Sequence, residues 1–62
     1  MLYFVWMMKP RRQKRYENVR TFTDVIEAVE YAVSISKSCN EPHRVRISDD
    51  DGRRILYVDK VR

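Results

Sequence analysis

Residues 23–38 read Thr-Asp-Val-Ile-Glu-Ala-Val-Glu-Tyr-Ala-Val-Ser-Ile-Ser-Lys-Ser, and no other segment is long and periodic enough to form one amphipathic helix. The apolar residues that recur at helical spacing are Val25, Ile26, Val29, Ala32 and Val33. The opposite stripe is polar and carries Glu27, Glu30, Ser34 and Lys37. Thr23 can cap the free N–H groups of the first turn. We therefore predict a helix over residues 23–38 that packs its apolar stripe against the rest of the chain.

The length and composition predict one small globular domain covering residues 1–62. Hydrophobic residues at 44% and charged residues at 35% exclude an intrinsically disordered composition. A chain this short buries only about 60% of its unfolded surface, so the core is expected to be thin and burial against a second copy stays open. The single cysteine, Cys39, rules out an internal disulfide and favours a cytoplasmic location.

The apolar opening segment is interpreted as a strand. Residues 1–8 are far shorter than the roughly 20 residues that cross a bilayer, and they lack the features of a secretory signal, so no membrane partner is expected. Residues 2–8 are apolar on both faces, as in a strand covered on two sides. One face presents Leu2, Phe4, Trp6 and Met8, and the other presents Tyr3, Val5 and Met7. If the helix covers one face, a dimer contact or a partner protein is expected on the other.

The next segments predict a hairpin with a basic tip. Residues 9–15 carry five positive charges in seven residues and are interpreted as a loop. Residues 16–22 alternate as a second strand, with Val19 on one side and Tyr16, Arg20 and Phe22 on the other. After the helix, residues 39–42 form a link, because Pro42 cannot continue a helix.

The last segments predict a second hairpin. Residues 43–48 and 54–59 flank Asp51-Gly52, which favours a two-residue turn. This turn sets the register, and the expected pairs are Arg44 with Asp59, Val45 with Val58, Arg46 with Tyr57, Ile47 with Leu56, Ser48 with Ile55, and Asp50 with Arg53. The predicted order is strand, strand, helix, strand, strand: an α+β fold with one helix on one face of an antiparallel sheet.

Charge is distributed unevenly along the chain. Residues 1–22 have a net charge of +5, residues 23–42 of −3 and residues 43–62 of +2. The predicted sheet is therefore basic and the helix acidic, which favours a polyanion or an acidic protein surface as the partner of the sheet.

The basic residues are candidates for binding DNA or RNA. The loop at residues 9–15 could follow a phosphate backbone, with Trp6 and Tyr16 available to stack bases, or it could be a solvated loop. Arg44, Arg46 and Tyr57 form a second patch, with Arg20 nearby, although the cross-strand pairs above could satisfy these charges internally. The candidate nucleic-acid-binding residues are Lys9, Arg11, Arg12, Lys14, Arg15, Arg20, Arg44, Arg46 and Tyr57.

A second hypothesis is a protein interface. Its candidate residues are Tyr3, Val5, Met7, Tyr31 and Ile35. The first three would be buried if the chain dimerises through its first strand. Tyr31 and Ile35 lie at the edge of the helix stripe and are expected either to meet a partner or to pack under a neighbouring loop.

No metal, cofactor or catalytic site is expected. Cys39 and His43 are four residues apart, but Pro42 lies between them and two ligands do not make a structural zinc site. A calcium loop with Gly52 at its sixth position would place Ile47 and Val58 where carboxylates are required. The chain offers no convincing pair of nucleophile and base, so we predict a protein without enzymatic activity.

From Phe22 to Val58, the pattern Phe-Thr-x-x-x-Glu-Ala-Val-Glu-Tyr-Ala, a short link and a strand ending in Asp-Asp-Gly-Arg resembles small bacterial and phage domains of hairpin-helix-hairpin topology. This resemblance implies a fold and supplies no activity. The layout is also similar to very small phage proteins that inhibit host RNA polymerase. The sequence thus predicts a basic binding protein for nucleic acid or a protein associated with it, with a phage-type inhibitor or a homodimerising subunit as the alternative.

Overall fold

The order of the elements follows the prediction. The structure is a computed structural model that describes the backbone of residues 1–60 and their side chains, apart from those of Gln13 and residues 56–60. The elements are β1 (Tyr3–Lys9), β2 (Gln13–Phe22), α1 (Val25–Ser38), β3 (His43–Asp49) and β4 (Arg54–Lys60). The predicted α+β class, with the order β-β-α-β-β, is confirmed.

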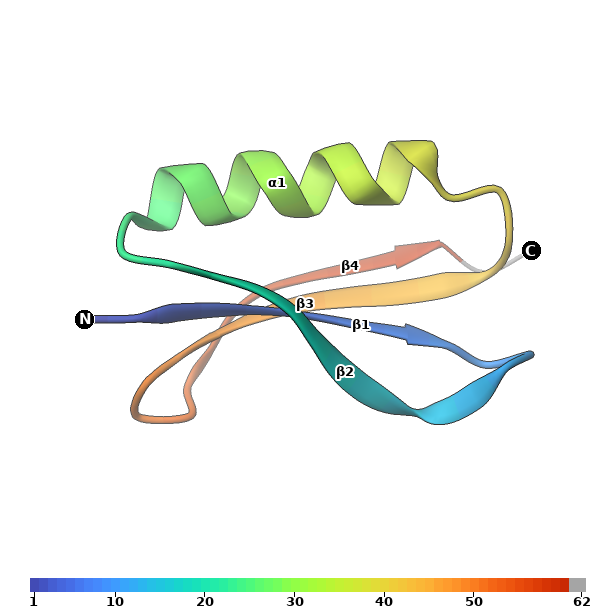
Figure 1. Cartoon of the computed structure of the whole chain (residues 1–62), viewed down its shortest axis with the longest axis horizontal. Coiled ribbons are helices and arrows are strands. Elements are labelled where there is room, and N and C mark those ends of the chain that lie inside the picture. Colours follow the sequence, from blue (N-terminus) through green and yellow to red (C-terminus); the bar gives the residue numbers. More distant parts are fainter. Residues whose placement is uncertain (61–62) are drawn as a thin grey trace.

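The four strands form one antiparallel sheet in the order β2-β1-β3-β4. β1 and β3 are therefore the central strands, and β1 is hydrogen-bonded along both of its edges. α1 lies along one face of this sheet, and no described element covers the other face (Figure 1). The loop between β1 and β2 lies at the end of the sheet where α1 ends, and the turn between β3 and β4 lies at the opposite end.

The core lies between α1 and the sheet. Its fully buried apolar residues are Val5, Ala28, Ala32, Val45 and Ile47. The side chains packed around them are Tyr3, Met7, Phe22, Val29, Tyr31 and Ile35. Because two alanines face the sheet, the helix can approach it closely while the larger side chains fill the margins.

The helix presents a different stripe from the predicted one. Ala32 is buried as expected, but Ile26 is 63% exposed and Val33 is 37% exposed. The buried helix residues are instead Ala28, Ala32 and Ser36. This stripe is also spaced by four residues, so it satisfies the same helical period. The predicted burial of Ile26 and Val33 is therefore wrong.

The N-cap residue of the helix lies one position later in the chain than predicted. Asp24, in an extended conformation, is the N-cap residue, and its carboxylate accepts a hydrogen bond of 3.0 Å from the backbone N–H of Ile26. The assignment of this role to Thr23 is therefore wrong. An aspartate at this position satisfies a free N–H and also places a negative charge at the positive end of the helix dipole.

A β-bulge changes the two faces of β2. Val5 lies opposite Arg20, whereas the next residue, Trp6, lies opposite Asn18, so Val19 is the extra residue. The extra residue reverses which positions of β2 face the helix, so odd and even positions exchange faces across the bulge. Arg20 and Phe22 lie toward the helix, while Tyr16 lies on the open face. The prediction that these three share one side is therefore wrong.

The register of β3 and β4 agrees with the prediction away from the turn. The four expected backbone pairs from Arg44–Asp59 to Ile47–Leu56 are present. At the turn, Ser48 lies opposite Arg54 instead of Ile55, and the N–H of Asp49 donates to the carbonyl of Arg53 at 3.0 Å. Gly52, with a φ of 81°, completes a three-residue loop. The two pairs predicted nearest to the turn are therefore wrong.

Candidate functional site

The uncovered face of the sheet carries an apolar row on its central strand β1. The row consists of Leu2, just before β1, and Phe4, Trp6 and Met8. Their neighbours Tyr3, Val5 and Met7 point toward the helix. Leu2 is 42% exposed and the other three members are partly buried. We call this surface the open face.

Trp6 is held in one orientation on the open face. Its indole Nε1 donates a hydrogen bond of 2.8 Å to the Oγ of Ser48 on β3. The ring of Phe4 lies 6.2 Å away, tilted by 41°. A hydrogen bond on one edge and an aromatic neighbour restrict the ring. Binding a ligand therefore costs less side-chain conformational entropy, because the ring is already ordered in the folded protein.

Arg46 lies beside Trp6 and contacts Tyr16. Its guanidinium carbon is 4.2 Å from the centre of the Tyr16 ring, a cation–π distance. Arg46 is on β3 and Tyr16 on β2, so the side chain reaches across β1. Among the described residues, no acidic side chain pairs with Arg46, and its Nε is buried without a hydrogen-bond partner. The guanidinium is thus held by an aromatic ring and not by a described carboxylate.

A depression of about 560 Å³ lies next to this pair, toward the β3–β4 turn. It is lined by Trp6, Arg46, Ser48, Gly52 and Arg54. Two arginines, a serine and a tryptophan are thus among the residues that border one hollow. Guanidinium groups suit phosphate oxygens or the edges of bases, and an indole suits the flat face of a base.

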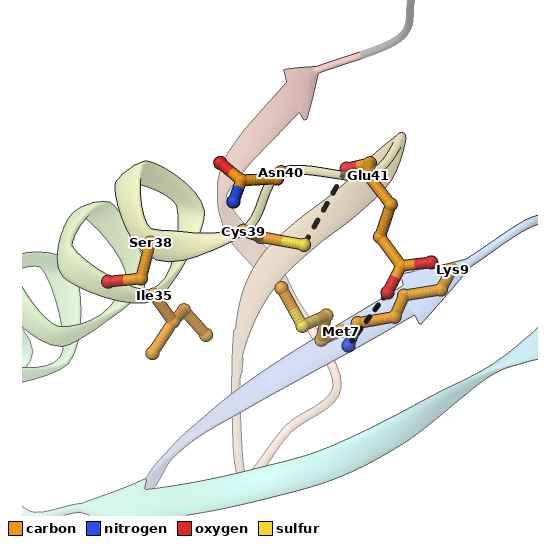
Figure 2. A pocket seen from close by; sticks show the side chains of 7 residues that line it. All are labelled: Met7, Lys9, Ile35, Ser38, Cys39, Asn40 and Glu41. Carbon is orange, nitrogen blue, oxygen red and sulfur yellow. Dashed lines mark hydrogen bonds and ion pairs between the residues drawn. The ribbon is translucent and has the colours of Figure 1, made fainter.

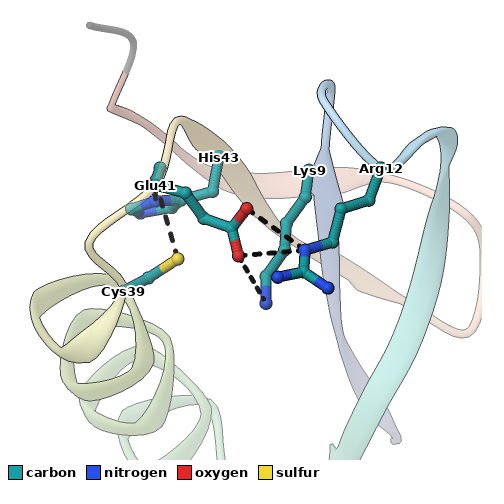
Figure 3. Close-up of polar contacts among 5 residues, drawn as sticks. All are labelled: Lys9, Arg12, Cys39, Glu41 and His43. Atoms are coloured by element: carbon teal, nitrogen blue, oxygen red, sulfur yellow. Dashed lines mark hydrogen bonds and ion pairs between the residues drawn. The ribbon is translucent and has the colours of Figure 1, made fainter.

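The basic loop is partly neutralised by a residue that the sequence analysis did not single out. Glu41 accepts hydrogen bonds from the Nε of Arg12 to both carboxylate oxygens, each at 3.2 Å, and the Nζ of Lys9 lies 3.5 Å away (Figure 3). The hydrogen bond from Arg12 lowers the pKa of Glu41 below its ordinary value of 4.5. Arg12 and Glu41 are 29 residues apart, so no local pattern signals this contact.

The fold divides the predicted nucleic-acid-binding residues between several places. Arg44 and Arg46 lie on the open face, and the backbone of Tyr57 lies opposite Arg46, although its side chain and that of Asp59 are outside the described residues. Lys9 and Arg12 contact Glu41. The prediction that residues 9–15 are all loop is wrong, because Lys9 ends β1 and β2 begins at Gln13. Arg11 lies in the loop, and Lys14 and Arg15 lie in β2; these three exposed side chains make no ion pair with a described residue.

Arg20 lies on the other side of the sheet. Its guanidinium carbon is 5.1 Å from the ring centre of Phe22 and 5.3 Å from that of Tyr31, a helix residue. The prediction that Arg20 is close to Arg44 and Arg46 is therefore wrong. The physical reason is the bulge at Val19, which directs Arg20 toward the helix.

The residues predicted as a protein interface form part of the packing under the helix. Val5 is completely buried, and Tyr3, Met7, Tyr31 and Ile35 pack against the core around it. The ring centres of Tyr31 and Phe22 are 5.4 Å apart. Assigning Val5 to an interface is therefore wrong, because the helix covers this row, and it is the alternate row of β1 that remains uncovered.

A second cavity lies between the end of α1 and β1 (Figure 2). It has a volume of about 560 Å³ and is lined by Met7, Lys9, Ile35, Ser38, Cys39, Asn40 and Glu41. Its polar groups contact one another: the Sγ of Cys39 donates to the carbonyl of Glu41 at 3.6 Å, and Lys9 pairs with the Glu41 carboxylate. These groups serve to join the link after α1 to the basic loop.

His43 is a buried structural residue next to this cavity. It is completely buried, its Nδ1 lies 2.8 Å from the carbonyl of Glu41, and its Nε2 lies 2.7 Å from the Oγ of Ser36. The carbonyl can only accept, so Nδ1 carries a proton and donates it to Glu41, and in the neutral imidazole Nε2 accepts from the Ser36 hydroxyl. Both ring nitrogens are thus engaged in joining α1 to β3.

Comparisons of the chain with protein-family models, with curated proteins and with solved structures found no match. The likeness to hairpin-helix-hairpin domains and to phage inhibitors therefore stays a prediction from the sequence. Within the described residues, no helix has the length and apolar character needed to cross a bilayer. What the fold defines is a class: one helix on one face of a four-stranded antiparallel sheet whose other face is basic and aromatic.

Proposed function

We propose that this protein binds nucleic acid through the open face of its sheet, with the basic loop extending the contact. The observation that carries the proposal is the pair formed by Arg46 and Tyr16 beside Trp6. This pair combines a positive charge, free of any described acidic partner, with aromatic surface on an uncovered face. Phosphates are attracted by such charges and bases by such rings.

The distribution of charge favours the open face, and not the helix face, as the surface that binds nucleic acid. The outer side of α1 carries Glu27 and Glu30, both exposed, which would repel phosphates. The open face carries Arg44 and Arg46, and the end of the sheet where β1 and β2 join adds Arg11 in the loop and Lys14 in β2. The whole chain has a net charge of +4, so long-range attraction favours a polyanion.

The test is a titration of a fluorescently labelled oligonucleotide, followed by anisotropy at low and moderate salt. We expect binding that weakens steeply with salt, and a loss of at least about fivefold in affinity for Arg46→Ala. Arg20→Ala is the matched control, because it also removes one cation and its aromatic contacts, but on the helix side. We expect it to change affinity by less than about twofold. Absence of binding at low salt, or equal losses in the two variants, would refute the proposal.

A second candidate function is association with another copy of the chain. The observation that favours it is the apolar row Leu2, Phe4, Trp6 and Met8 on the open face, which a dimer would remove from water. Light scattering would then give the mass of two chains, and Phe4→Lys would restore the mass of one. A single-chain mass across the concentration range would exclude this function.

A further inference from the structure

We infer that the nucleic acid is single-stranded and that the depression beside Trp6 receives one of its bases. This inference rests on the proposed function and specifies the ligand of the same face. In a duplex, the flat faces of the bases are hidden by stacking on their neighbours. Only an unpaired base can present its face to an aromatic side chain, so an indole that borders a hollow favours single strands.

The size and lining of the depression fit a nucleotide. Its volume of about 560 Å³ lies within the roughly 300–1,000 Å³ typical of small-molecule sites. Its lining residues include the two arginines Arg46 and Arg54. The Oγ of Ser48 accepts the indole hydrogen bond, so its own hydrogen can be donated to a carbonyl or phosphate oxygen of the ligand. The indole is thereby fixed by the same residue that offers a polar contact.

The ends of the sheet give the bound strand a direction. The turn at Asp49–Asp51 lies at one end of the sheet and the basic loop lies at the opposite end (Figure 1). At the turn, the exposed Asp50 and Asp51 offset the charges of Arg53 and Arg54, whereas residues 11–15 contain no acidic residue, so phosphates are attracted more strongly to the loop end. From the base in the depression, the backbone therefore runs away from the turn, across Arg46 and toward the loop.

The experiment uses Trp6, the single tryptophan of the chain, as its own probe. The full chain is titrated with three oligonucleotides of equal length: a single strand, the same sequence as a duplex, and an abasic strand with an intact backbone. We expect the single strand to quench Trp6 fluorescence and to bind at least tenfold more tightly than the other two. A duplex or an abasic strand that binds as tightly as the single strand would overturn the inference, while binding by any of them would keep the proposed function.

Two variants of Trp6 separate stacking from folding. With a labelled single strand, we expect Trp6→Leu to reduce affinity by roughly 5- to 150-fold, the range for losing one stacked base, and Trp6→Phe to recover most of it. Circular dichroism checks that both variants keep the fold. If Trp6→Leu is folded and binds like the unchanged protein, the base does not stack on Trp6. If none of the three probes binds to the unchanged protein at low salt, the proposed function itself falls.

Discussion

The carboxylate of Asp49 is expected to be the main side-chain contribution to the turn between β3 and β4. Its Oδ1 accepts two backbone hydrogen bonds, from the N–H of Asp51 at 3.0 Å and from that of Arg53 at 2.9 Å. Asp49 is only 9% exposed, whereas Asp51 is exposed and its carboxylate accepts no hydrogen bond from a described residue. The two aspartates are therefore a matched pair for substitution by alanine.

The expected magnitude follows from these two hydrogen bonds. A hydrogen bond to a charged group contributes about 1.5–3 kcal/mol when it is well buried. The two N–H groups lie in an exposed loop and can be hydrated after substitution, so we expect Asp49→Ala to lower the free energy of unfolding by about 2–3 kcal/mol in total. A domain of this size has a total stability of about 3–9 kcal/mol, so the loss is a large fraction of it. Asp51→Ala should change stability by less than about 0.5 kcal/mol.

Asp49→Asn tests whether the charge or the geometry matters. Asparagine keeps an oxygen at the same position, and it also removes one of three adjacent negative charges. We expect a loss of about 1 kcal/mol, smaller than that of alanine. Urea unfolding followed by circular dichroism measures all three variants. Equal losses for Asp49→Ala and Asp51→Ala, or for the asparagine and alanine variants of Asp49, would refute this account of the turn.

Three further predictions concern other parts of the fold. Gly52→Ala is expected to cost about 1–2 kcal/mol in urea unfolding, because the φ of 81° strains a residue with a Cβ, although no neighbouring atom obstructs that Cβ. Ile26→Glu is expected to leave the protein folded, because Ile26 is exposed. Ala32→Glu is expected to abolish the cooperative unfolding transition, because Ala32 is buried against the sheet. Since Arg12 lowers the pKa of Glu41, the stabilisation by this ion pair is present above pH 4.5 and is lost as the pH falls through the lowered pKa. The difference in stability between the unchanged protein and Glu41→Gln, measured by urea unfolding at several pH values, should therefore shrink in acid; a constant difference would contradict the pairing.

Features set by neighbouring residues could be predicted from the sequence. The register of β3 and β4 follows from alternating residues around Asp51-Gly52, and four of its pairs are as expected. The loop length was predicted incorrectly because an Asp-Gly sequence suits both a two-residue turn and a three-residue loop that ends in a glycine with positive φ. The side chain of Asp49 favours the second form by binding the N–H groups of the longer loop.

Features set by distant residues could not be predicted. Two stripes of α1 have helical spacing, and the sequence alone favoured the one with larger apolar residues. The sheet decides between them, since Ser36 is drawn inward by its hydrogen bond to His43. The bulge at Val19 carries no glycine or proline to signal it, so simple alternation placed Arg20 on the wrong face.

We expect the affinity for nucleic acid to depend more on the open face than on the basic loop, although the loop carries more positive charges. The basic loop has the highest charge density in the sequence, but Glu41 already occupies Lys9 and Arg12. The Glu41 carboxylate beside these two cations repels an approaching phosphate, which reduces the net gain from that contact. Arg46 is held by the Tyr16 ring and, among the described residues, pairs with no carboxylate. One arginine in an aromatic setting can thus contribute more to binding than two arginines or lysines whose charges are already paired.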